Sequence, residues 1–234
     1  MLIRKLVNGH SKAPKETFFL EAGLLPLLFV CMKRRLMYLY HILSKPKTEL
    51  IREVYEVQKN LFTKNDWYNL VHENKNDLLI ALSDEQISKL SKKKFKFIVS
   101  QAVERKALDY LNNLALSHSK SKNLIKQRLV MENYFRDARF SKSEIELLLA
   151  LRTKMVKDIK KNFPSQYSEN LTCDLCQLHI CCQEHLLSCV ELKKQVKIPD
   201  DIQYSDIFGS TDKQLRIVRV IKQLLRVREI LKSE

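Results

Sequence analysis

A shortage of glycine and proline most narrows what this 234-residue chain can fold into. It has three glycines and five prolines, whereas a β-sandwich or β-barrel needs turn residues about every ten positions. Hydrophobic residues make up 45% of the chain and charged residues 29%, which is an ordinary balance for a protein with a packed core. The sequence therefore predicts a mainly α-helical fold, built as a helical bundle.

Apolar residues recur at helical spacing along most of the chain. One such stripe, which we expect to face the core from a helix within residues 46–62, consists of Leu50, Val54, Val57 and Leu61. Ser83 and Gln86 have the spacing of a capping box, and Ser143 is the expected cap of a helix that continues toward residue 163. The last predicted helix is amphipathic and turns inward Leu215, Val218, Ile221, Leu225 and Ile230.

These patterns predict four segments. Residues 1–23 form an N-terminal extension, residues 24–163 a basic helical body, residues 171–190 a small cysteine-rich module, and residues 191–234 a loop followed by the amphipathic helix. The small module thus precedes the C-terminal helix.

The cysteine-rich module has the spacing of a metal site. Cys173 and Cys176 are separated by two residues, so one tight turn can offer both thiolates to an ion. His185 and Cys189 are four residues apart and share one face if this stretch is helical. The sequence predicts that these four residues bind one structural zinc ion, and it leaves open that His179, Cys181 or Cys182 replaces one of them.

Disulfide bonds and simple core packing are the two weaker interpretations of this cysteine cluster. Disulfides need an oxidising compartment, and the first 21 residues lack the pattern of a secretory signal peptide. The apolar run Ala22–Met32 is too short to span a bilayer. We therefore expect an intracellular protein, nuclear or cytoplasmic and not secreted, with no transmembrane segment.

The charge of the chain favours polyanionic partners. Its formal net charge is +15, which creates a positive surface potential that attracts RNA or DNA. The lysines that we expect to contact phosphates are Lys92, Lys93, Lys94, Lys120, Lys122, Lys160 and Lys161.

The chain also resembles a known family over roughly residues 12–231. The fragments "CDLC" and "QEHLLSC" are similar to the CCHC zinc knuckle near the C-terminus of non-LTR retrotransposon reverse transcriptases, in particular the jockey-like endonuclease–reverse transcriptase polyproteins. Further similar blocks are "HSKAPKETFFLEAGLLPLLFVCMKRRLMYLYHIL", "LSHSKSKNL", "LLLALRTKMVKDIKKNF" and "YSDIFGSTDKQLRIVRVIKQLLRVREIL". The resemblance implies the region after the polymerase palm, which binds nucleic acid and belongs to a reverse transcriptase ribonucleoprotein.

The sequence departs from this family at informative positions. Asp174 stands where the family often has proline, and Leu28 where it often has a basic residue. The palm's adjacent aspartates are absent: Asp206, in "YSDI", stands alone, and "PDD" (199–201) reads as a turn. Nucleotidyl transfer needs closely placed carboxylates that hold metal ions, so we expect no enzymatic activity from this chain. The alternative function is a protein-interaction or structural helical domain with a structural zinc.

Overall fold

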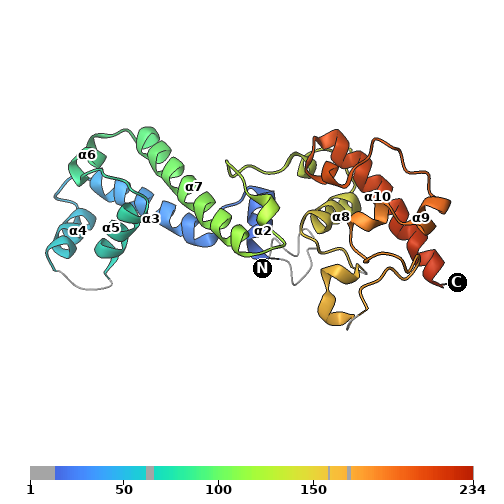
Figure 1. The fold of residues 1–234 in the computed structure, drawn as a ribbon. Coiled ribbons are helices and arrows are strands. Elements are labelled where there is room, and N and C mark those ends of the chain that lie inside the picture. The colour runs from blue at the N-terminus through green and yellow to red at the C-terminus, as the bar shows by residue number, and fades with distance from the viewer. Residues whose placement is uncertain (1–13, 62–65, 158, 168–169, 234) are drawn as a thin grey trace. The chain divides into compact units, whose positions relative to one another are not determined.

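The computed structural model describes residues 14–61, 66–157, 159–167 and 170–233, and it is mainly helical as predicted (Figure 1). Its α-helices are α2 (Lys15–Ala22), α3 (Leu27–Leu43), α4 (Leu50–Asn60), α5 (Trp67–Asp77), α6 (Asp84–Lys89), α7 (Lys92–Ser117), α8 (Lys142–Arg152), α9 (Val190–Gln195) and α10 (Thr211–Ser233). Short 3₁₀ turns join them: η1 (Lys122–Leu124), η2 (Asn133–Phe135), η3 (Lys160–Asn162), η4 (Pro164–Gln166), η5 (Glu184–Leu187) and η6 (Tyr204–Phe208). No described helix is both long enough and apolar enough to cross a membrane.

The chain divides into two compact units, each with its own core. The helical unit contains residues 24–113 and 126–129. The cysteine-rich unit contains the described residues up to 23, together with 114–125 and those from 130 onward. This division cuts across the predicted 24–163 body, because apolar side chains between 134 and 159 pack in one core with those of α10.

The structure describes only the end of the predicted N-terminal extension. Residues 1–13 lie outside the described residues, whereas residues 15–22 form α2, which buries Phe18 and Leu20. Gly23 ends this helix with φ 62°, a left-handed conformation that favours glycine. A Cβ atom at Gly23 would lie 2.2 Å from the backbone nitrogen of Met131, so no larger residue fits.

In the helical unit, α3 buries its apolar face. Phe29, Met32, Leu36 and Leu39 are all less than 5% exposed. The predicted capping box of α6 is also present, since the side chain of Ser83 accepts from the Gln86 N–H and the Gln86 side chain accepts from the Ser83 N–H.

The prediction for α4 is wrong about which face is buried. Its stripe is exposed instead, at Leu50 (75%), Val54 (48%), Val57 (56%) and Leu61 (56%), the last of which caps the helix. Tyr55, on another face, is 1% exposed, and its hydroxyl donates to the Asp84 carboxylate at 2.7 Å. The ring of Tyr55 packs in the core of the unit and its hydroxyl has a polar partner there, so the helix buries this face and not the predicted stripe.

In the cysteine-rich unit, α8 and α10 lie side by side (Figure 1). Helix α10 buries Leu215, Val218 and Ile221 as predicted, but Ile230 near its end is 57% exposed. Helix α8 also differs from the prediction at both ends. Ser141, and not Ser143, caps it through a capping box with Glu144, and it stops at Arg152 because Lys154 takes a left-handed backbone conformation (φ 53°).

A buried ion pair ties α2 to α8. Glu21 is fully buried and Arg152 is 7% exposed, and the guanidinium donates to Oε1 of Glu21 at 3.0 and 3.2 Å. The hydroxyl of Tyr134 donates to the other oxygen of Glu21 at 2.6 Å. Arg152 also donates to the carbonyl of Ile207 in η6 at 2.8 Å, so one cation links three parts of this unit.

Candidate metal centre

Cys173 and Cys176 lie in a tight turn that backbone hydrogen bonds close. The N–H of Cys173 donates to the carbonyl of His179 at 2.8 Å, and the N–H of Gln177 donates to that of Cys173 at 2.9 Å. Gln177 has φ 53°, the left-handed conformation that such turns often need. The two-residue spacing therefore forms the turn that the sequence predicts.

His185 and Cys189 come from the next turn of the chain. His185 lies in η5, and Cys189 is the residue directly before α9. The N–H of Cys189 donates to the carbonyl of His185 at 2.8 Å, which is the bond of one α-helical turn. Because Oγ of Ser188 lies 3.4 Å from Nδ1 of His185, the Nε2 atom is left to face the thiols.

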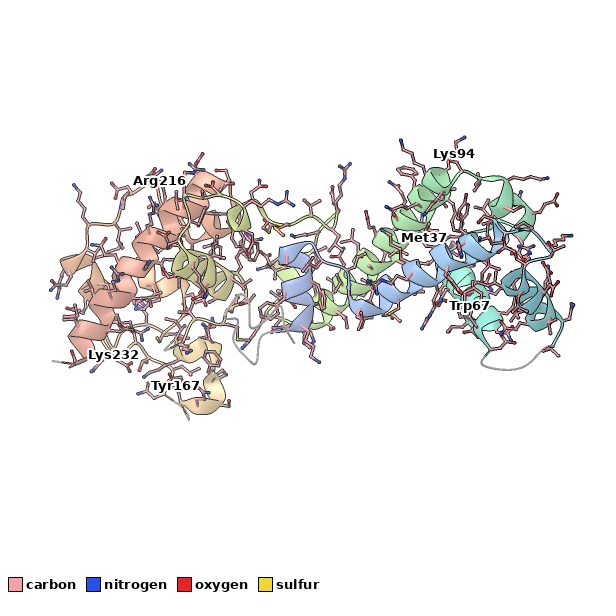
Figure 2. All side chains as sticks on the ribbon, turned by 180° about the vertical axis from the view of Figure 1, so that it is seen from behind. Met37, Trp67, Lys94, Tyr167, Arg216 and Lys232 are labelled. Carbon is pink, nitrogen blue, oxygen red and sulfur yellow. The ribbon has the colours of Figure 1, made fainter. Side chains whose placement is uncertain are left out.

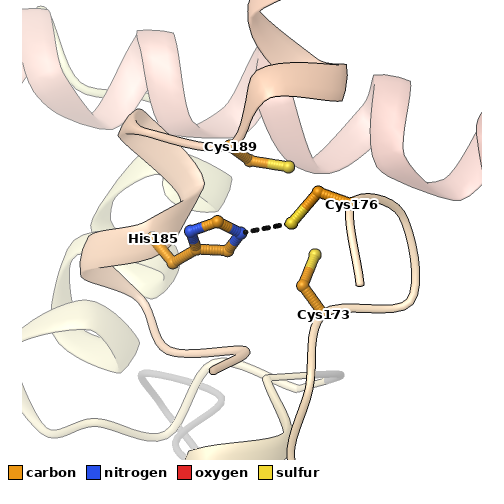
Figure 3. Close-up of side chains that lie close together, drawn as sticks. All are labelled: Cys173, Cys176, His185 and Cys189. Atoms are coloured by element: carbon orange, nitrogen blue, oxygen red, sulfur yellow. Dashed lines mark hydrogen bonds between the residues drawn. The ribbon is translucent and has the colours of Figure 1, made fainter. Parts of the chain in front are cut away.

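The four side chains converge on one point (Figure 3). Their ligand atoms all lie within 4.8 Å of one another, and Nε2 of His185 is 3.3 Å from Sγ of Cys176. In a tetrahedral zinc site with Zn–S bonds of about 2.3 Å, the ligand atoms are separated by a little under 4 Å. Cys173, Cys176, His185 and Cys189 therefore form a cluster that can hold a metal ion.

The electrostatics of the cluster fit a cation. Burial alone would raise the pKa of the Cys176 thiol, but the N–H groups of Leu178 and His179 donate to it and bring that pKa below the ordinary value. Burial, together with the neighbouring thiolate of Cys173, raises the pKa of Cys189 to about 11. Burial also lowers the pKa of His185. A neutral imidazole can donate its lone pair to a metal ion. The thiols repel one another when they ionise, and a positive ion bound between them would relieve that repulsion.

The three alternative ligands lie outside this cluster. Cys181 is buried, and its sulfur accepts from Nη2 of Arg228 at 3.0 Å. Burial, along with the carboxylate of Glu184, raises the pKa of Cys182. His179 is exposed, with its ring centre 5.4 Å from that of His185. Among the described residues, the predicted quartet is the one group of three or more such side chains close enough to share an ion.

Asp174 holds the turn of this site against the rest of the unit. Its carboxylate lies 2.5 Å from Nζ of Lys160, 2.6 Å from Nζ of Lys232 and 3.8 Å from Nη2 of Arg228. Lys160 and Arg228 are both nearly buried. The turn that carries Cys173 and Cys176 is thus joined to η3 and to α10 by one carboxylate.

We expect Asp174→Asn to destabilise the cysteine-rich unit by about 2 kcal/mol, because it leaves Lys160 buried without its partner. Although burial would raise the pKa of Asp174, Lys160 and Lys232 lower it overall. A lowered pKa means that the stabilisation is present above the ordinary Asp value of about 4 and is lost as the pH falls through the folded value. The difference between the two proteins in urea unfolding should therefore be full at neutral pH and shrink in acid.

The matched control for Asp174 is Asp212→Asn. Asp212 is 73% exposed and pairs with Arg139, so its loss should cost less than about 1 kcal/mol. Equal costs for the two variants would contradict the role assigned to Asp174.

The predicted phosphate contacts fall into two groups. Lys92, Lys93, Lys94, Lys122 and Lys161 are exposed. Two others are engaged inside the cysteine-rich unit, contrary to the prediction for them. Lys160 is 8% exposed and pairs with Asp174, and Lys120 donates to the carbonyl of Asn162 at 2.8 Å while its ammonium lies over the Phe163 ring. Each of these two lysines is held by an oxygen atom of a residue distant in sequence, the carboxylate of Asp174 or the carbonyl of Asn162. The spacing of lysines along the chain does not reveal such contacts.

The isolated aspartates that follow the cysteine-rich module also have structural partners. Asp201 lies 2.8 Å from Nη1 of Arg216, and Asp206 accepts from the N–H of Gln203 and lies 3.4 Å from Nζ of Lys213.

The sequence did not predict a role for Arg228 in this site. A basic residue within the inward stripe of an amphipathic helix is the signal that could have identified it.

No family model, curated protein or solved structure matches this chain.

Proposed function

We propose that this chain is a nucleic-acid-binding module with one structural zinc ion and no catalytic activity of its own. We further propose that it derives from the C-terminal region of a retrotransposon reverse transcriptase. The family resemblance of its cysteine-rich module supports the origin. The observation that carries the binding function is a cluster of exposed lysines at the start of α7 that have no ion-pair partner among the described residues.

The donor set supports zinc as the ion. Three thiolates and one imidazole are a common set for structural zinc, and four protein ligands leave no position for a catalytic water. With zinc bound, the centre would carry a charge of about −1. The buried guanidinium of Arg228, which already contacts Cys181 and lies 3.8 Å from Asp174, is suited to offset that charge.

The basic cluster consists of Lys92, Lys93, Lys94 and Lys96 at the start of α7 (Lys94 is labelled in Figure 2). All four side chains are exposed, and none lies within ion-pair distance of a carboxylate among the described residues. Their place is electrostatically unfavourable, since the N-terminal end of a helix already carries partial positive charge. A polyanion bound here would relieve this repulsion, and phosphate contacts are the main source of affinity for nucleic acid.

The salt dependence of RNA binding tests this proposal. Each phosphate contact on a single strand contributes about −0.7 to the log–log slope of affinity against salt. Replacing Lys92, Lys93 and Lys94 together with alanine should therefore flatten the slope by about two units if all three touch phosphates. Filter binding or fluorescence anisotropy with single-stranded RNA over a range of salt concentrations provides the measurement.

The control removes the same charge elsewhere on the helical unit. Lys45 and Lys89 are paired with Glu49 and Glu85, and Lys47 is exposed. Alanine at these three positions should change the slope much less. An equal change in both variants, or no binding to RNA at low salt, would reject the proposal.

The second candidate function is a protein-interaction domain, and the exposed stripe of α4 favours it. Leu50, Val54, Val57 and Leu61 form an apolar surface that a partner protein could cover. Binding to a protein that persists at high salt, together with no binding to RNA, would support this alternative.

A further inference from the structure

A phenylalanine stands on the surface of the helical unit beside two hollows. Phe97, on α7, is 64% exposed. It lines two hollows, of about 470 Å³ and about 560 Å³, and Ile98 also lines both. The exposed ring thus belongs to the wall of two neighbouring open spaces.

The lining of both hollows combines apolar and basic side chains. The first is lined by the segment 78–82 that follows α5 and by Gln101 and Arg105 of α7. Lys93 and Lys94 are among the residues that line the second hollow. No carboxylate is among the described residues that line either one. The surface therefore suits a ligand that has flat apolar parts and negative charges.

One of the lining residues has an unusual backbone. Leu79 has φ 55°, and its side chain is 78% exposed at the first hollow. The N–H groups of Leu79 and Ile80 close the end of α5 by donating to carbonyls of Asn76 and Lys75. Glycine is the usual residue at this position of a helix end. A strained, exposed leucine beside an exposed ring is a local arrangement that packing does not require.

Four polar and aromatic groups form one row along α7. Lys93, Phe97, Gln101 and Arg105 are spaced four residues apart, so each is a neighbour of the next on the helix surface, and the row winds partly around the helix. With a rise of 1.5 Å per residue, the row extends about 18 Å along the helix axis. Positive charges stand at both ends and the ring lies between them, so an extended strand could contact all of them together.

We propose that this surface, Leu79 with the Lys93–Arg105 row of α7, binds the unpaired bases of a single-stranded nucleic acid. This inference rests on the proposed function and adds that the bases are held by stacking on Phe97. Bases enter the hollows beside the ring, and Lys93, Lys94 and Arg105 contact the flanking phosphates. A duplex, whose bases are already stacked on one another, offers no free base for the ring.

The charges favour nucleic acid over an acidic protein as the occupant. Lys92 and Lys96 are also exposed at the start of α7, next to Lys93 and Lys94. Positive charge therefore continues along the surface as it would beside a phosphate backbone. An acidic amphipathic helix would need its charges only at the edge of an apolar face. The test below therefore treats a peptide ligand as the competing result.

The first experiment replaces the ring. Phe97→Ala should weaken binding to an oligonucleotide of about 12 unpaired uridines roughly tenfold, the effect of losing one stacked base. The salt slope should stay the same, since no charge is removed. Phe97→Trp should retain binding. Because Phe97 is largely exposed, its replacement leaves no cavity, and Leu50→Ala, at a 75% exposed apolar residue of the same unit, is the control.

The second experiment replaces the strained leucine and locates the bound oligonucleotide by photocrosslinking. Leu79→Gly should raise the melting temperature by removing the strain, yet weaken oligonucleotide binding several-fold. Irradiation of the full chain with an oligonucleotide that carries 5-iodouracil, which reacts mainly with aromatic side chains, should place a crosslink at Phe97.

These results separate the inference from the proposed function. Salt-dependent RNA binding that Phe97→Ala leaves unchanged, with crosslinks elsewhere, would overturn the inference and leave the function in place. In that case an acidic protein partner becomes the better occupant of the hollows. If the unaltered chain binds no RNA at all, both proposals fail.

Discussion

Cys176→Ser is expected to abolish zinc binding and unfold the 171–190 segment. The sulfur of Cys176 is one of the four ligand atoms and lies 3.3 Å from Nε2 of His185, and two backbone N–H groups prepare it to bind as a thiolate. Structural zinc contributes on the order of 10 kcal/mol to the folding of small modules at neutral pH. Native mass spectrometry should find one zinc in the original chain and none in the variant.

The effect should extend beyond the segment but stop at the helical unit. Cys173, Leu186 and Cys189 pack in the same core as Ile217, Ile221 and Leu224 of α10, so loss of zinc should also lower the stability of the cysteine-rich unit. The helical unit has a separate core. Most of the helical circular dichroism of α3 to α7 should therefore remain, and a strong chelator added to the original chain should give the same result.

Two further cysteines provide the controls. Cys182→Ser tests an alternative ligand, and Cys31→Ser changes a cysteine of the helical unit. Both variants should keep one zinc. Loss of zinc in Cys182→Ser, with retention in Cys176→Ser, would show that the quartet is assigned incorrectly.

The candidate metal ligands were predictable from sequence because their spacing is local. Cys173 and Cys176 share one turn, and His185 and Cys189 share another, so short-range geometry brings each pair together. The meeting of the two pairs depends on packing, which the sequence does not show. Each pair supplies only two ligands, however, and a tetrahedral site needs four, so the two pairs could be assigned to one site.

Long-range polar contacts were not predictable in the same way. Helix α4 has an apolar stripe on an exposed face, because it buries Tyr55, whose ring packs in the core and whose hydroxyl donates to Asp84, 29 positions away. Lys160 lies in a basic run of the sequence, but the structure buries it beside Asp174. In both cases contacts with residues distant in sequence outweigh the local hydrophobic or charge pattern.

Arg152→Met is expected to destabilise the cysteine-rich unit by about 3–5 kcal/mol, because it leaves the fully buried carboxylate of Glu21 without its cation. This is a large share of the stability of a typical domain, which is about 5–15 kcal/mol. Urea unfolding followed by circular dichroism should show an earlier transition for this unit. Arg139→Met is the control, since Arg139 is 55% exposed and its described partners are a partly exposed and an exposed aspartate, and it should cost less than about 1 kcal/mol.

A double variant shows whether the pair itself is stabilising. Glu21→Leu combined with Arg152→Met removes both charges and keeps most of the volume, so it should be more stable than Arg152→Met alone. Full recovery is not expected, because Tyr134 would lose its acceptor on Glu21 and the carbonyl of Ile207 would lose its donor on Arg152. If Arg152→Met costs no more than Arg139→Met, the buried pair does not hold α2 to α8. If the double variant is as unstable as the single one, the lost hydrogen bonds and not the unpaired carboxylate account for the effect.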